Sequence, residues 1–264
     1  MNRLEKCFER CAAENRKALV MYVTAGCPDL KTTEQLINSI ITAGADIIEL
    51  GVPFSDPMAD GPTIQLSSQK ALDAGTELKD IIAMGGRIRK NSEAPMILFS
   101  YYNVILAYGV EKLAKECAEL GIDGWLIVDV PLEERDELLP TMEQQGLSLI
   151  PLIAPTTPPE RAARIVKDAQ GFIYYITVKG VTGARTSFNE DPAAKLSALR
   201  KMSPVPVVGG FGISTPEMAA KTAKNADGIV VGSALVKITL QDKAPEVIIQ
   251  ESIEFVSSLA EALK

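Results

Sequence analysis

The sequence predicts a closed (β/α)8 TIM barrel, in one domain over residues 1–264, with an extra helix at the N-terminus. Short apolar runs alternate with amphipathic stretches of helical composition, which is typical of a parallel sheet covered by helices. Eight such runs in 264 residues match a barrel better than a doubly wound sheet. No long polar or proline-rich linker divides the chain, so we expect a single domain.

The expected strands are the runs with the length and branching of buried strands, at residues 19–24, 46–50, 96–100, 124–129, 148–153, 172–177, 205–209 and 227–231. Three of them are entered through a similar stretch with a small residue shortly before an aspartate: Gly44-Ala45-Asp46, Gly121-Ile122-Asp123 and Asn225-Ala226-Asp227. This repetition indicates a reused turn geometry rather than shared chemistry.

The expected helices begin with residues 2–15, where Leu4, Cys7, Phe8 and Cys11 share one face. That face predicts a helix covering the bottom of the barrel. Thr32 or Thr33 is the expected N-cap of a helix that ends near Ala43. Further helices are expected near residues 63–73, 77–90, 109–120, 132–145, 158–169, 192–202 and 215–224, with one or two more up to Lys264.

Composition excludes several function classes. The net charge of −7 argues against nonspecific attraction to nucleic acid or to anionic membranes. No apolar run is long enough for a membrane span, and residues 1–6 lack the core of a signal peptide. We therefore expect a soluble, cytoplasmic protein.

The cysteines form no C-x-x-C pair, and the chain has no histidine. We expect Cys7, Cys11, Cys27 and Cys117 to be reduced structural thiols, and we expect no metal site. Without histidine, proton transfer near neutral pH falls to carboxylates, lysine, tyrosine or cysteine. A carboxylate with a raised pKa is the leading option.

Residues 45–65 hold the strongest candidate site. Glu49 lies in a buried apolar strand, where a carboxylate is costly, and the loop after it carries Asp56 and Asp60. A strand glutamate is more often an edge residue or ion-pair partner, and loop aspartates often cap helices. In a barrel, however, that loop lies on the catalytic face.

The other strand ends carry mainly aromatic and aliphatic groups, which suits a flat apolar ring. Glycine-rich turns follow the last two strands, at residues 209–212 and 232–233, and another follows the sixth, at 180–183. Such turns are ordinary tight connections or a backbone cradle for phosphate, and their position favours phosphate. The long loop at residues 178–191 has the composition of a lid.

The stretch E-L-G-V-P-F-S-D-P-M-A-D-G-P-T-I-Q at residues 49–65 closely resembles the signature of the tryptophan synthase α subunit family. Shorter family motifs follow in order: T-A-G-x-P at 24–28, A-G-A-D at 43–46, Y-x-N at 101–103, V-D-V-P at 128–131, G-V-T-G at 180–183, G-F-G-I-S at 210–214 and G-S-A at 232–234. The resemblance covers nearly the whole chain.

The resemblance implies a lyase that splits indole-3-glycerol phosphate into indole and glyceraldehyde 3-phosphate. Glu49 would be the proton donor and acceptor, and Asp60 would hydrogen-bond the indole N–H. The indole pocket would be lined by Tyr22, Phe99, Ile153, Tyr174 and Phe211. Phosphate would be held by Gly183, Gly210, Gly212, Gly232 and Ser233, and Thr182 would engage Asp60 when the lid closes. Tyr22 stands where phenylalanine is common, and Val178-Lys179 stand where some members carry arginine.

The resemblance further implies a β subunit partner in an α2β2 heterotetramer. Pyridoxal phosphate (PLP) would belong to that partner, and this chain would need no cofactor of its own. The surface facing the partner would include Pro53, Asp56, Asn103 and Pro131.

Three alternatives remain open. The chain could be a stand-alone lyase that releases free indole, because the same residues would serve both reactions. It could be another phosphate-binding barrel, such as an isomerase or cyclase, although the predicted strands lack the lysine expected there. It could also be a noncatalytic binding subunit, which the two carboxylates and three glycine turns argue against.

Overall fold

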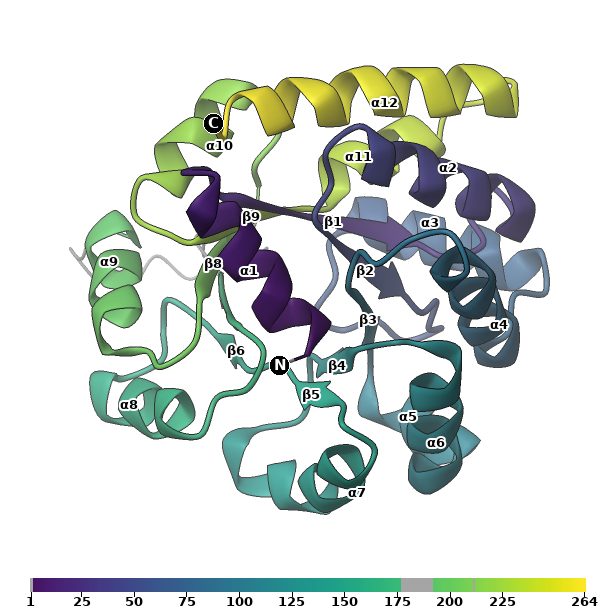
Figure 1. Cartoon of the computed structure of the whole chain (residues 1–264). Coiled ribbons are helices and arrows are strands. Elements are labelled where there is room, and N and C mark those ends of the chain that lie inside the picture. Colours follow the sequence, from purple (N-terminus) through teal and green to yellow (C-terminus); the bar gives the residue numbers. More distant parts are fainter. Residues whose placement is uncertain (1, 177–191, 211) are drawn as a thin grey trace.

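The computed structural model describes residues 2–176, 192–210 and 212–264, which form one parallel sheet surrounded by helices (Figure 1). The strands are β1 (Ala18–Thr24), β2 (Ile47–Gly51), β3 (Met96–Ser100), β4 (Gly124–Ile127), β5 (Ser148–Leu149), β6 (Leu152–Ile153), β7 (Ile173–Ile176), β8 (Val207–Gly210) and β9 (Gly228–Val231). Their order in the sheet is β5-β4-β3-β2-β1-β9-β8-β7-β6. Strands that follow one another in sequence are therefore neighbours, except β5 and β6 at the two ends of the order, and β9 lies beside β1, as a barrel requires.

The fifth predicted strand, residues 148–153, is two short strands. β5 pairs with β4, and β6 pairs with β7, so Ile150 and Pro151 join the two ends of the sheet. The Ile150 N–H donates to Trp125 O at 2.8 Å, and the Tyr174 N–H donates to Pro151 O at 3.0 Å. Because proline has no N–H, regular pairing stops at Pro151. The chain itself thus closes the barrel, with eight strand positions.

The helices cover the outside of the sheet. They are α1 (Arg3–Ala13), α2 (Leu30–Thr42), α3 (Pro62–Asp73), α4 (Leu78–Arg89), α5 (Tyr102–Tyr108), α6 (Val110–Leu120), the 3-10 helix η1 (Leu132–Glu137), α7 (Leu139–Gln144), α8 (Pro159–Lys167), α9 (Pro192–Met202), α10 (Pro216–Ala223), α11 (Ser233–Thr239) and α12 (Pro245–Glu261). None within the described ranges is long and apolar enough to cross a lipid bilayer.

Three helix predictions were wrong in detail. The N-cap of α2 is Asp29, whose carboxylate accepts from the Thr32 N–H at 2.8 Å, rather than Thr32 or Thr33. The short helix α5 was not predicted. The helix expected at 132–145 is broken into η1 and α7 at Leu138, the residue before Leu139-Pro140.

α1 covers the bottom of the barrel, as predicted. Its buried face (Leu4, Cys7, Phe8 and Cys11) packs with inward-facing residues near the beginnings of the strands, among them Val20 and Ile47. Figure 1 shows α1 lying across the barrel. A separate apolar cluster, which includes Met21, Ile48 and Leu98, packs between the sheet and the outer helices. Because α1 covers the lower end of the barrel, the open end is the one at the carboxyl ends of the strands.

The repeated aspartates share one structural role, as the sequence indicated. Each of these aspartates makes two hydrogen bonds with one residue of the neighbouring strand. Its backbone N–H donates to that residue's carbonyl, and its carboxylate accepts that residue's N–H. The pairs are Asp46 with Leu19, Asp123 with Met96, and Asp227 with Val207. Each carboxylate also pairs with an arginine, namely Arg16, Arg89 and Arg200. The pattern therefore fixes strand register at three places.

Candidate active site

A cavity of about 220 Å³ opens at the carboxyl ends of the strands. It brings together eight of the residues predicted from sequence: Tyr22, Glu49, Asp60, Phe99, Tyr174, Gly212, Gly232 and Ser233. It is also lined by Val230 and by residues 61–64 at the beginning of α3. The two candidate carboxylates and two of the glycine turns thus face one space.

Glu49 lies on β2, where alternation along the strand turns Ile47 and Glu49 into the barrel and Ile48 and Leu50 toward the outer helices. Only 1% of Glu49 is exposed, and within the described residues its Oε1 atom has no hydrogen-bond partner. Because burial disfavours the carboxylate form, the pKa of Glu49 rises to about 8. Glu49 is therefore mainly protonated at neutral pH.

Asp60 lies in the loop between β2 and α3, and its carboxylate accepts a hydrogen bond from the Tyr101 hydroxyl at 2.9 Å. Burial raises the pKa of Asp60 to about 6, and the bond from Tyr101 opposes that rise. Near pH 7 Asp60 is therefore mainly ionised beside a protonated Glu49.

Sequence reasoning placed Tyr101 at the end of the third strand, in the Y-x-N motif, but gave it no role in the site. Its hydroxyl also accepts a hydrogen bond from the Ala59 N–H at 3.0 Å, and the centroid of its ring lies 5.1 Å from that of the Phe54 ring. Tyr101 therefore holds the loop that carries Asp60 against the end of β3. Its position directly after a predicted strand placed it at the mouth of the barrel, but nothing in the sequence showed its contact with Asp60.

The apolar wall of the cavity contains Tyr22 and Phe99, whose rings meet edge to face with centroids 5.2 Å apart. The Tyr22 hydroxyl lies over Gly51, where an added Cβ would come within 2.2 Å of it, and it accepts a bond from Thr24 at 3.4 Å. The hydroxyl that distinguishes Tyr22 from phenylalanine thus occupies space that is free because residue 51 is a glycine.

The glycine turns lie at the same end of the barrel. Gly212, with φ of +78°, borders the cavity with Gly232 and Ser233, where α11 begins. Gly210 ends β8 beneath the Tyr174 hydroxyl, which would lie 2.5 Å from an added Cβ. Thr182, Gly183, Phe211 and the predicted lid at 178–191, with Val178-Lys179, lie outside the described residues.

The prediction for Ile153 was wrong. Ile153 faces outward and packs against α8 and α9 in a cluster with Ile165 and Leu199. Its neighbour Leu152 packs with the inner cluster of the barrel. Because successive strand residues point to opposite sides, only one of the two can face the mouth.

The predicted partner surface is only partly exposed. Asp56, Asn103 and Pro131 are exposed, whereas Pro53 is buried and offers little surface to another chain. Sequence reasoning assigned the loop at residues 53–60 to this surface but did not single out its Met58, which is 85% exposed, and it missed Leu106 on α5, which is 50% exposed. Exposed apolar groups of this size are typical of an interaction surface when they gather.

Comparison with known proteins places this site in a family context. A family model described as "Tryptophan synthase alpha chain" matches residues 8–264. Curated tryptophan synthase alpha chains from Geobacter sulfurreducens and Pelobacter propionicus are 48% and 49% identical over 263 residues, covering 100% of this chain and 99% and 98% of theirs.

Solved structures of tryptophan synthase have the same fold as this chain. Tryptophan synthase subunit alpha from Legionella pneumophila is 38% identical to this chain, with a TM-score of 0.87. The match covers 100% of this chain and 98% of the Legionella chain. A chain of aminoacrylate-bound tryptophan synthase from M. tuberculosis is 31% identical with a TM-score of 0.88 and full coverage of both chains.

Proposed function

Because the chain belongs to the family of tryptophan synthase alpha chains, we propose that its cavity cleaves indole-3-glycerol phosphate to indole and D-glyceraldehyde 3-phosphate. Membership makes the chain a lyase of tryptophan biosynthesis. One observation supports the proposed chemistry above others: two carboxylates with different pKa values border a single cavity with an aromatic wall.

Glu49 acts first as an acid. Its protonated carboxyl group transfers a proton to C3 of the indole ring, which leaves the ring nitrogen positively charged. The resulting carboxylate then takes the proton from the glycerol hydroxyl next to the bond that breaks. As the carbonyl of glyceraldehyde 3-phosphate forms, the electron pair of the broken carbon–carbon bond returns to the ring. A pKa near 8 suits a group that both gives and takes this proton.

Asp60 stabilises the charge that appears on the ring nitrogen. Its carboxylate accepts a hydrogen bond from the indole N–H, and the bond from Tyr101 fixes the carboxylate in place. Tyr22, Phe99 and Tyr174 contact the ring. Backbone N–H groups at Gly212 and Gly232, with Ser233, hold the phosphate, since these residues border the same cavity.

We further propose that this chain works with a β subunit that carries the PLP, in an α2β2 heterotetramer in the cytoplasm, while this chain binds no cofactor itself. Its partner surface comprises Asp56, Asn103 and Pro131 with the exposed Met58 and Leu106. Similarity over full length to chains named as alpha chains favours this arrangement over a stand-alone lyase.

An assay of indole release with and without a β subunit tests the proposal. We expect slow release from indole-3-glycerol phosphate by the chain alone and faster release when the partner is added. Release that the partner leaves unchanged would favour the stand-alone lyase, and no release in either case would contradict the proposed reaction.

A further inference from the structure

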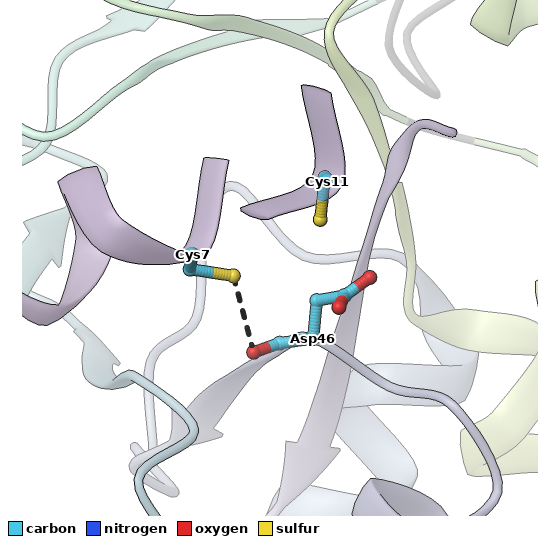
Figure 2. Close-up of side chains that lie close together, drawn as sticks. All are labelled: Cys7, Cys11 and Asp46. Atoms are coloured by element: carbon cyan, nitrogen blue, oxygen red, sulfur yellow. Dashed lines mark hydrogen bonds between the residues drawn. The ribbon is translucent and has the colours of Figure 1, made fainter. Parts of the chain in front are cut away.

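Two thiols lie together at the end of the barrel opposite the cavity. Cys7 and Cys11 are one turn apart on α1, are 4% and 1% exposed, and both face Asp46 (Figure 2). The two sulfur atoms and a carboxylate oxygen of Asp46 all lie within 4.8 Å of one another. The proposed function uses none of these groups.

The carboxylate of Asp46 is not free to bind an ion. Its Oδ1 atom accepts from Arg10 at 2.9 Å and from Arg16 at 2.8 Å, and its Oδ2 atom accepts from Arg16 at 2.6 Å and from the Leu19 N–H at 3.0 Å. Four donors use the four lone pairs of a carboxylate. The two sulfur atoms are therefore the ligands that this cluster can offer.

The surrounding charges favour an anionic group between the sulfurs. Arg10 and Arg16 carry two positive charges, and Asp46 neutralises one of them. Glu14 also contacts Arg16, but its side chain is half exposed, so water screens its charge. Arg10 is also half exposed, so water screens its charge as it does that of Glu14, and the net charge of the four groups is near zero. An anionic group is favoured at Cys7 because the Arg10 Nη2 atom lies 3.9 Å from the Cys7 Sγ atom.

We propose that Cys7 and Cys11 form a two-thiolate site for a soft monovalent cation such as Cu(I). Two thiolates and one monovalent cation carry a net charge of −1, which the Arg10 guanidinium beside Cys7 would offset. Binding releases both thiol protons to solvent. Thiolates are the ligands that Cu(I) prefers, whereas a structural zinc ion requires four protein ligands.

Geometry favours a bridging ion over a disulfide. Residues four apart on a helix have Cβ atoms about 5–6 Å apart, but a disulfide needs about 3.5–4.5 Å. Two metal–sulfur bonds of about 2.3 Å each, the length found for zinc, span up to about 4.6 Å. An ion between the sulfurs therefore leaves α1 undistorted, whereas a disulfide would bend it.

An entry path lies beside the thiols. A cavity of about 460 Å³ at the bottom of the barrel is lined by Arg10, Arg16 and Asp46. Neither thiol lines this cavity, but Arg10 does, and its Nη2 atom lies 3.9 Å from Cys7 Sγ. The half-exposed Arg10 side chain is therefore a group that an entering ion would displace.

Competition for Cu(I) against a chromogenic chelator, with reduced protein and without oxygen, tests the proposal. We expect the wild-type protein to retain one equivalent of Cu(I), and Cys7→Ser and Cys11→Ser each to lose it. Cys27 and Cys117 are buried apart from this pair, so Cys27→Ser and Cys117→Ser should retain it. Arg10→Gln should bind more weakly, because it removes the compensating charge.

X-ray absorption on the wild-type protein keeps the test independent of whether the variants fold. Two sulfur ligands and no nitrogen or oxygen ligand would support the site. Three results would each overturn the proposal: wild-type protein that fails to retain Cu(I), Cys7→Ser and Cys11→Ser variants that retain as much Cu(I) as wild type, or nitrogen or oxygen ligands on the bound copper.

Discussion

Tyr101 donates a hydrogen bond to Asp60 at 2.9 Å, whereas Glu49, on the same cavity, has a carboxylate oxygen with no donor among the described residues. Both carboxyl groups are raised in pKa by burial, to about 6 for Asp60 and about 8 for Glu49. The bond from Tyr101 opposes the rise only at Asp60. One acid of each protonation state is therefore available near neutral pH.

The pH dependence of catalysis should follow from this pair. Activity requires Asp60 ionised and Glu49 protonated, so kcat/KM should rise as pH passes about 6 and fall as it passes about 8. Initial rates of indole release from about pH 5 to about pH 10 would measure both limbs. A profile that stays flat across this range would contradict the assignment.

Tyr101→Phe should move the acid limb of that profile. The variant loses the hydrogen bond that lowers the pKa of Asp60, so the rise in kcat/KM should occur at higher pH while the basic limb stays in place. Tyr102→Phe is the matched control, because the Tyr102 hydroxyl bonds Glu137 on the surface. An unchanged acid limb in Tyr101→Phe would show that this bond does not tune Asp60.

Glu49 should cost the protein stability as pH rises. Its pKa is about 8 in the folded chain against an ordinary 4.5, so the folded state binds the proton more tightly and loses stability between these two values. The loss is on the order of 5 kcal/mol. Glu49→Gln removes it, so this variant should gain stability over wild type as pH rises to about 9.

Denaturant unfolding of wild type and Glu49→Gln across this pH range would measure the gain. Glu111→Gln, at an exposed position of α6, should show no such gain. A constant difference between wild type and Glu49→Gln at every pH would argue against a raised pKa.

Asp123→Ala should destabilise the fold and leave the chemistry intact. Asp123 is buried, pairs with Arg89 at 2.8 Å and accepts the Met96 N–H, so its removal leaves a buried guanidinium without its carboxylate. Breaking such a pair costs about 3–5 kcal/mol. Asp56→Ala, at an exposed loop position, should change the free energy of unfolding by less than about 0.5 kcal/mol.

Much of the fold was predictable because strands buried on both faces are apolar throughout, and helices are amphipathic. The break at Pro151 was missed because residues 148–153 form one apolar run. The helix α5 was missed because Y-N-V-I-L-A-Y shows no amphipathic period. In both cases hydrophobicity alone could not show which backbone hydrogen bonds form.

The site was partly predictable for a similar reason. Glu49 stands out as a carboxylate within an apolar strand, and the glycine turns follow identifiable strands. Ile153 was misplaced because the side of the barrel that it faces depends on the register after Pro151. The role of Tyr101 was missed because its bond to Asp60 exists only once the loop after β2 folds onto the end of β3.

The most direct test is indole release from indole-3-glycerol phosphate by Glu49→Gln, compared with wild type, with unfolding curves recorded to show that both are folded. Glutamine keeps the shape of the side chain and removes the transferable proton. We expect the variant to be folded and to release no indole above the uncatalysed rate. Release at the wild-type rate would remove Glu49 from its role and contradict the mechanism.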